Sequence, residues 1–369
     1  RGPKMPKAPK LPAAESIHLL LEGEIPSEDG LHPRCPGQKF GKSTYKVYEA
    51  VAGLEGDEES VKPYLLVWLH GMDNGSIEPG YLTTIQKRLR HRVIFVVPMS
   101  PQTQEGVHFN WACAFRKQQN KKQLGFVHGT LHEGYLNALT SKISDLAYEF
   151  DAERVLVMGY SMGGFGAFQL GGFAPDVFDV VISVAGYGLG TLEPEDEMYN
   201  APQPQSSDIF ENFLCSVVTE LSRVPVVLGV HARKDSMSSF RDVKKIIQKC
   251  KETLDRRSEE KHVAELLEVA DEWADSDRNG RKKKISGHHY FNFSLLDDSS
   301  EEFLWSKVRE YLSTAPLRLE LQPLQFDRPV APAQIGGSLR CSDCNGSRYF
   351  DLIRTELETE KIKRGRWKE

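Results

Sequence analysis

Short apolar runs alternate with longer segments of helical periodicity through most of the chain. The runs are rich in Val, Ile and Leu and have the length of buried strands, which predicts strands at 45–51, 64–69, 92–98, 154–158, 177–185 and 224–230. Apolar positions with helical spacing predict helices at 81–90, 131–150 and 238–250. This alternation favours an α/β fold, in which a mostly parallel central sheet has helices on both faces and binds ligands at the carboxyl ends of its strands.

One predicted strand runs directly into a G-x-S-x-G turn. Residues 155–158 (VLVM) precede the segment GYSMG at 159–163, and apolar positions suited to a packed helix follow. A nucleophilic hydroxyl needs such a sharp strand-to-helix turn, and only glycine lets the neighbouring backbone pass so close to the serine. We therefore expect Ser161 to be a nucleophile. The alternative is a glycine-rich turn without chemistry.

Two later segments contain the residue types that activate a serine. Asp235 follows the predicted strand 224–230, where an acid could accept the imidazole N–H of a histidine and hold its tautomer. The late loop Gly287-His288-His289 follows in the chain, and the order serine, acid, histidine is one in which known triads occur. We favour His288 over His289 as the base on loop position alone. The alternatives are an aspartate that caps a helix and a surface histidine pair.

A glycine-containing segment after the strand 64–69 has the features of an oxyanion hole. It contains His70, Gly71 and Met72, and its glycines let the backbone turn beneath a substrate carbonyl. We expect the N–H groups of Met72 and Met162 to hold the developing oxyanion. An ordinary strand-to-helix turn is the alternative.

Composition narrows the class of protein. The chain has 369 residues, 40% of them hydrophobic, and 47 basic and 52 acidic residues are well mixed, with a net charge of −5. No single-sign field argues for a nucleic-acid partner or an anionic membrane. No apolar run approaches the ~20 residues of a membrane span. The sequence leaves open whether the chain forms a homo-oligomer.

The six cysteines are scattered and no secretory signal is visible, so we expect reduced thiols and a cytoplasmic location. Cys341 and Cys344 have the spacing of a zinc ligand pair, but the nearby sequence offers no second pair. We therefore expect no metal.

The motifs together resemble the α/β-hydrolase superfamily. Segments 62–71 (KPYLLVWLHG) and 159–167 (GYSMGGFGA) are similar to the phospholipase/carboxylesterase, esterase D and feruloyl-esterase group, as are 98–101 (PMSP) with Trp111 and the acid motif 231–235 (HARKD). The resemblance implies hydrolysis of carboxylic esters or thioesters through an acyl-enzyme, without a cofactor. We expect a Ser161-Asp235-His288 triad and substrate contacts from His70, Gly71, Tyr160, Trp111 and His289.

The chain departs from this group in two places. Ala232 replaces the usual glycine of the acid motif, and the 53 residues from Asp235 to His288 (288 − 235) indicate an insertion, which we place at 271–284. Its basic residues could recognise an anionic substrate, although a solvated charge run is the favoured interpretation. We expect a partly disordered lead-in at 1–42, a catalytic domain at 43–312 and a Pro-rich extension at 313–369 with a short helix at 349–361.

Three functions fit these residues. An esterase or thioesterase is favoured, because the motif set of that group is complete. A serine peptidase of the prolyl-oligopeptidase type is the second, since its histidine loop resembles residues 287–290, but no propeller repeat precedes the catalytic region. The third is a noncatalytic binding protein with a hydrolase fold.

Overall fold

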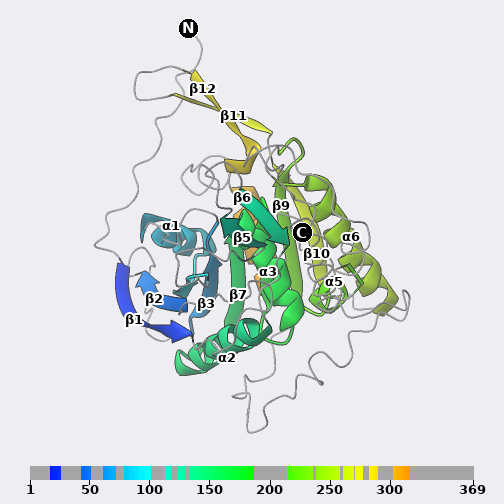
Figure 1. The fold of residues 1–369 in the computed structure, drawn as a ribbon. Coiled ribbons are helices and arrows are strands. Elements are labelled where there is room, and N and C mark those ends of the chain that lie inside the picture. Colours follow the sequence, from blue (N-terminus) through cyan, green and yellow to red (C-terminus); the bar gives the residue numbers. More distant parts are fainter. Residues whose placement is uncertain are drawn as a thin grey trace, which may run out of the picture.

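A computed structural model gives the fold of this chain (Figure 1). It describes residues 17–25, 43–50, 61–71, 79–100, 111, 113–117, 124–128, 133–186, 214–215, 217–235, 238–257, 261–269, 271–276, 282–289 and 302–315. The strands are β1 (Ile17–Ile25), β2 (Ser43–Ala50), β3 (Tyr64–Leu69), β4 (Val93–Pro98), β5 (Cys113–Lys117), β6 (Leu124–His128), β7 (Arg154–Tyr160), β8 (Val180–Val184), β9 (Val226–Ala232), β10 (Val263–Val269), β11 (Glu272–Ser276) and β12 (Lys282–Ser286). The helices are α1 (Pro79–Leu89), α2 (Glu133–Glu149), α3 (Met162–Phe173), α5 (Val217–Leu221), α6 (Phe240–Arg257) and α8 (Glu302–Thr314), with a 3₁₀ turn, η3 (Gly287–His289).

Eight strands form one central sheet in the order β1-β2-β4-β3-β7-β8-β9-β10. The β1–β2 and β2–β4 pairs are antiparallel, and all the other neighbours in this sheet are parallel. The predicted α/β fold with a mostly parallel sheet is confirmed. Because β7, β8 and β9 lie side by side, the loops that leave their carboxyl ends gather at one edge of the sheet.

Helices cover the sheet on both faces, as the continuous apolar runs predict. Successive strand residues point to opposite faces, so Leu65 and Val67 pack on one side with α2, α3, α5 and α6. Leu66 and Trp68 pack on the other side with α1 and α8. Figure 1 shows α3 lying across the middle of the sheet, next to β7. The strand that carries the G-x-S-x-G turn is therefore held in the centre of the core.

The structure has one strand that the sequence analysis did not predict in the N-terminal lead-in. β1 pairs with β2 along the edge of the sheet, with a register shift between Leu19 and Leu21. The side chain of Leu20 is 39% exposed and that of Leu19 is 50% exposed. Irregular pairing and exposed apolar residues remove the alternation that identifies a half-buried strand. Part of the 1–42 segment thus belongs to the sheet, while the domain boundaries stay predictions.

The segment between Asp235 and His288 also contains structure that the sequence analysis missed. Its first part contains α6, which matches the predicted helix at 238–250, and β10, which was not predicted. At the expected insertion, β11 and β12 pair as a hairpin that projects from the end of the sheet in Figure 1. The mixture of acidic and apolar residues in β10 fits an edge strand only once its partner β9 is known. The extension beyond residue 315, with its predicted helix and Cys341 and Cys344, lies outside the described residues.

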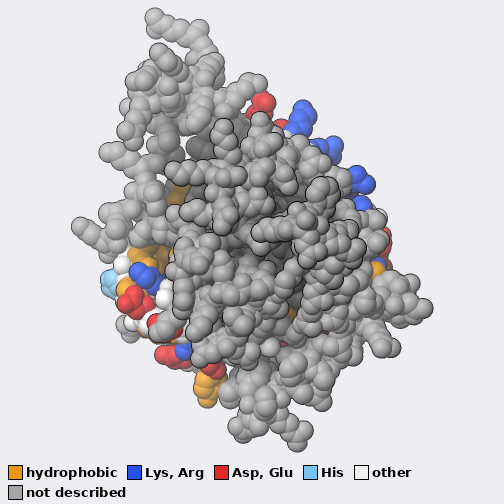
Figure 2. Space-filling model, in the orientation of Figure 1, with side chains coloured by type: hydrophobic (Ala, Val, Ile, Leu, Met, Phe, Trp, Pro, Cys, Tyr) orange, Lys and Arg blue, Asp and Glu red, His pale blue; other side chains and the backbone are white. Residues whose placement is uncertain are grey.

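The surface of the described residues carries both signs of charge. Figure 2 shows basic and acidic side chains along the margins of one face. Within the described part of the chain, no helix combines the length and the apolar character that crossing a bilayer demands.

A buried arginine links β7 to Asp179, just before β8, and to the end of α8. Arg154 and Asp179 have side chains only 4% exposed, and their closest charged atoms lie 3.9 Å apart. The Arg154 guanidinium also donates to the carbonyl oxygens of Leu312 (3.1 Å) and Ala315 (2.8 Å). Asp179 Oδ2 accepts the backbone N–H of Val155 at 2.7 Å. Arg154 thus connects the end of α8 to the amino end of β7.

We expect Arg154→Met to lower the free energy of unfolding by about 3–5 kcal/mol, because it removes one partner of a buried ion pair. Lys62→Met is the matched control. The Lys62–Asp151 pair is exposed, with 59% and 73% of the side-chain surface accessible, so its loss should cost less than about 1 kcal/mol. Urea unfolding of both variants measures the difference, and equal losses would contradict the role assigned to Arg154.

Candidate active site

Ser161 lies at the junction of β7 and α3 with a backbone that an L-residue rarely adopts. Its φ is 56° and its ψ is −119°. The Ser161 N–H donates to Val184 O at 2.8 Å, and its carbonyl accepts the N–H of Gly164 at 2.9 Å. A strained residue of this kind persists only where the surrounding structure holds it, and such residues cluster at functional sites.

The flanking glycines are required by close backbone contacts. A Cβ atom at Gly159 would lie 2.0 Å from the carbonyl oxygen of Gly163, and one at Gly163 would lie 2.0 Å from Leu69 O. No side chain fits at either position. The two glycines of the G-x-S-x-G pattern are therefore required because β3, β7 and α3 pack closely beneath Ser161.

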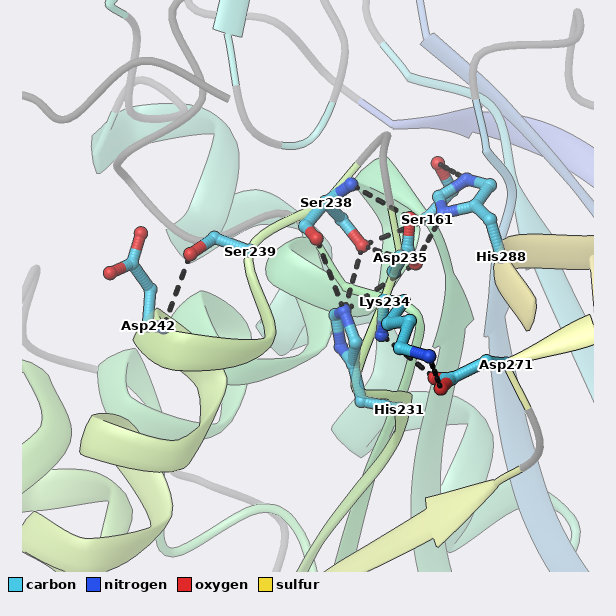
Figure 3. A network of polar contacts seen from close by, with 9 residues as sticks. All are labelled: Ser161, His231, Lys234, Asp235, Ser238, Ser239, Asp242, Asp271 and His288. Carbon is cyan, nitrogen blue, oxygen red and sulfur yellow. Dashed lines mark hydrogen bonds and ion pairs between the residues drawn. The ribbon is translucent and has the colours of Figure 1, made fainter. Parts of the chain in front are cut away.

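Ser161, His288 and Asp235 form a continuous chain of hydrogen bonds (Figure 3). His288 Nδ1 lies 2.7 Å from Asp235 Oδ2, and His288 Nε2 lies 3.1 Å from Ser161 Oγ. An ionised carboxylate can only accept, so Nδ1 donates its N–H to Asp235. Nε2 is then free to accept the Ser161 hydroxyl proton. The His288 and Asp235 side chains are 2% and 0% exposed, so water does not compete for these bonds.

Each of the three side chains comes from a different strand end. Ser161 follows β7, Asp235 lies three residues after β9, and His288 belongs to η3, which follows β12. The parallel order β7-β8-β9 places the first two at the same edge of the sheet. The structure thus brings together the three residues that were predicted as a triad.

Ser238 and His231 complete the surroundings of the Asp235 carboxylate, and the sequence analysis assigned a role to neither. Ser238 Oγ–H donates to Asp235 Oδ2 at 2.8 Å, and the Ser238 N–H donates to Oδ1 at 3.0 Å. His231 Nε2 lies 3.0 Å from Ser238 Oγ and 3.4 Å from Asp235 Oδ2. Because the Ser238 proton goes to the carboxylate, Nε2–H of His231 donates to the hydroxyl oxygen. Buried carboxylates stay charged only with such donors.

The arrangement keeps His231 neutral. Burial lowers the pKa of this imidazole from 6.5 to about 4, with the nearby Asp235 charge and the Ser238 carbonyl acting against the shift and His288 adding to it. Its Nδ1 atom has no hydrogen-bond partner among the described residues, and its ring lies edge-on to Phe240. His231 therefore acts as a neutral donor behind the acid.

His70 is oriented by backbone groups at both ring nitrogens. The Ser100 N–H donates to Nε2 at 3.0 Å, so Nδ1 carries the proton and donates to Gly71 O at 2.6 Å. Gly71 itself faces the nucleophile, because a Cβ atom there would lie 3.5 Å from Ser161 Cβ. The predicted contact of His70 with substrate stays a prediction; its Nδ1–H bond helps to fix the backbone of Gly71 beside the turn.

The other predicted contact residues differ in their surroundings. Trp111 is fully buried and packs edge-on against His70, with ring centroids 5.3 Å apart, so it supports His70 from the core. The ring of Tyr160 lies 5.5 Å from that of His288. Met162 is the first residue of α3, while Met72 and the side chain of His289 lie outside the described residues.

No group of three His, Cys, Asp or Glu side chains suited to a metal ion occurs among the residues that the structure describes. The chemistry that these residues offer is proton transfer between Ser161 and His288, with Asp235 holding the imidazole, beside the amino end of a helix.

The pKa of His231 predicts a pH-dependent stability. Its folded-state pKa of about 4 lies below the ordinary 6.5, so the unfolded chain binds more protons between these values. Stability from His231 is fully present above pH 6.5 and is lost as the pH falls toward 4. His231→Gln keeps an N–H donor but cannot titrate, so its free energy of unfolding should fall less steeply than that of the wild type in this window. Parallel curves from pH 7 to 4 would contradict a buried neutral histidine.

Comparison with known proteins identifies the family of the chain. Residues 56–275 match the family model Esterase, described as "Putative esterase". No curated protein matches the chain. Among solved structures, a thermostable esterase is 14% identical over 75% of this chain and 60% of its own, with a TM-score of 0.44. A "putative dipeptidyl aminopeptidase IV" from Bacteroides ovatus is 13% identical over 82% and 36%, with a TM-score of 0.46. Est1E from Butyrivibrio proteoclasticus is 13% identical over 76% and 95%, with a TM-score of 0.39.

The chain spans 60% and 36% of the first two of these proteins. The family match covers 220 of the 369 residues (275 − 56 + 1), from the segment before β3 into β11. It includes the Ser161 turn and Asp235. The chain therefore belongs to the esterase family and has the α/β-hydrolase fold.

Proposed function

We propose that the protein is a serine hydrolase that cleaves carboxylic esters or thioesters through an acyl-enzyme. The observation that carries the proposal is the buried hydrogen-bond chain from Ser161 Oγ through His288 to Asp235, at 3.1 Å and 2.7 Å. Membership of the esterase family supports the same chemistry. Ser161 is the proposed nucleophile, His288 the general base and acid, and Asp235 the residue that orients His288.

In the first half of the reaction, Ser161 Oγ attacks the carbonyl carbon of the ester while its proton moves to His288 Nε2. The carbonyl oxygen becomes an oxyanion in a tetrahedral intermediate. When the intermediate collapses, the bond to the alcohol or thiol breaks and the leaving group takes the proton from Nε2. In the second half, water attacks the acyl-serine by the same route and restores Ser161.

The amino end of α3 supplies the electrostatic support for the oxyanion. The first N–H groups of a helix have no acceptor within it, and the helix dipole is positive at this end. Met162 begins α3, so its N–H is our first candidate donor. We keep the N–H of Met72 as the second, in line with the contact between Gly71 and Ser161.

Ser161→Ala should abolish hydrolysis of p-nitrophenyl esters and labelling by a fluorophosphonate probe, with a loss of about 10⁴-fold or more, since removing a serine nucleophile removes the covalent route. Ser183→Ala is the matched control. Ser183 is also buried, and it pairs with Gly159 where β8 lies beside β7, but it does not belong to the Ser161-His288-Asp235 hydrogen-bond network. It should keep both activities. Labelling that survives in Ser161→Ala would move the nucleophile elsewhere.

The same assay separates the other candidate functions. With a peptide amide as a second substrate, a serine peptidase would cleave the amide as well as the activated ester, whereas an esterase would cleave the ester alone. A binding protein without catalysis would show neither labelling nor turnover in the wild type.

Ser238→Ala should lower the turnover number on p-nitrophenyl acetate by about 10-fold, because a hydrogen bond to a charged group, of the order of 1.5–3 kcal/mol, no longer orients the Asp235 carboxylate. Ser239→Ala is the control. Its hydroxyl accepts the N–H of Asp242 at 3.3 Å, away from Asp235, so its loss should leave turnover unchanged. Steady-state kinetics measure both variants, and equal turnover numbers would exclude a role for Ser238.

A further inference from the structure

The acid and the base of the proposed reaction reach the site from loops that are far apart in the chain. Asp235 follows β9, while His288 follows the hairpin β11–β12, with α6 and β10 between them. A hydrogen bond joins their side chains. Contacts that join the backbones of the two loops also set the distance between them.

Asp271, at the base of the hairpin, bonds to both loops. Its carbonyl oxygen accepts the N–H of Gly287 at 2.7 Å, and its Oδ1 accepts the N–H of Lys234 at 2.8 Å. Gly287 immediately precedes His288, and Lys234 immediately precedes Asp235. One residue thus contacts the neighbour of the acid through its side chain and the neighbour of the base through its backbone. Figure 3 shows Asp271 reaching Lys234 beside Asp235.

Asp271 can fix the acid loop through its bond to the Lys234 N–H, and less well through its ion pair with the Lys234 ammonium. Lys234 Nζ lies 3.6 Å from Asp271 Oδ2, but the Lys234 side chain is 83% exposed, so water screens this pair and leaves the ammonium mobile. The Asp271 side chain is only 28% exposed. A carboxylate that accepts a peptide N–H makes a charge-assisted bond with a fixed direction.

We propose that Asp271 is a positioning residue that sets the separation between the acid loop and the base loop. The proposal rests on the function proposed above. If Lys234 or Gly287 shifts, the next residue shifts with it, and the bonds of His288 to Asp235 and Ser161 lengthen or lose alignment. A displacement of 1 Å in such a site can cost about 10²-fold in rate.

Four variants test the contact. Asp271→Ala removes the side-chain acceptor but keeps the carbonyl, and it should lower the turnover number on p-nitrophenyl acetate by about 10-fold or more, with a KM within about twofold of the wild type. Asp271→Asn keeps an oxygen that can accept the Lys234 N–H, so it should recover most of this loss. Lys234→Ala removes only the ammonium and should resemble the wild type. Glu268→Gln, which breaks the exposed pair with Arg233 on the same side of the sheet, should also leave turnover unchanged.

A second readout does not depend on turnover. The proton between His288 Nδ1 and Asp235 should give a downfield proton NMR resonance in the wild type, assigned by its loss in His288→Ala. We expect it to weaken or move upfield in Asp271→Ala and to persist in Asp271→Asn and Lys234→Ala. A resonance and a turnover number that are both unchanged in Asp271→Ala would overturn the positioning role, and so would equal losses in Asp271→Ala and Asp271→Asn.

Fluorophosphonate labelling of wild-type Ser161 is scored separately. If the wild type does not label but the resonance responds to Asp271→Ala, the proposed function fails and the positioning of His288 by Asp271 stands. If the wild type labels and Asp271→Ala labels at the same rate with the same resonance, the reverse holds.

Discussion

The hydrogen bond between the Asp235 carboxylate and His288 Nδ1 is the contact on which the rest of the site depends. A charge without solvent exposure is costly unless donors surround it, and this carboxylate has donors at both oxygens. The bond places the His288 proton on Nδ1 and leaves Nε2 facing Ser161. Without this bond, the imidazole could turn or change tautomer. Nε2 would then no longer be placed to accept the Ser161 hydroxyl proton.

The surrounding fold can be understood as support for that contact from three sides. His231 and Ser238 stand behind the carboxylate, the tight meeting of β3, β7 and α3 holds Ser161, and Asp271 ties the two loops that carry the acid and the base. The second and third of these supports connect parts of the chain that are distant in the sequence. The hairpin β11–β12 lengthens the sequence between Asp235 and His288. Asp271, just before this hairpin, bonds to both of the loops that carry them.

Much of this could be predicted from the sequence, because some signals are local. The runs at 64–69 and 154–158 are apolar since both faces of the sheet are covered, and the glycines beside Ser161 reflect contacts within one turn. Asp235 and His288 followed from their order and their positions after predicted strands and loops. The edge strands β1 and β10 were not predicted, because polar and charged residues at exposed positions interrupt the apolar pattern of a buried strand. Ser238 and His231 lie three and four residues from Asp235, but neither residue type by itself shows that its side chain turns toward the carboxylate. Asp271 carries no local signal, because its role depends on bonds to two loops that are distant in the sequence.

The most direct test of the account is to trap the acyl-enzyme. Rapid quenching of the wild-type protein with p-nitrophenyl acetate, followed by peptide mass spectrometry, should find one acetyl group per chain, attached to Ser161, together with a burst of nitrophenol of matching size. The adduct should be absent from Ser161→Ala and present in Ser183→Ala. Turnover of the ester with no adduct on Ser161, or with the acetyl group on another residue, would contradict the account.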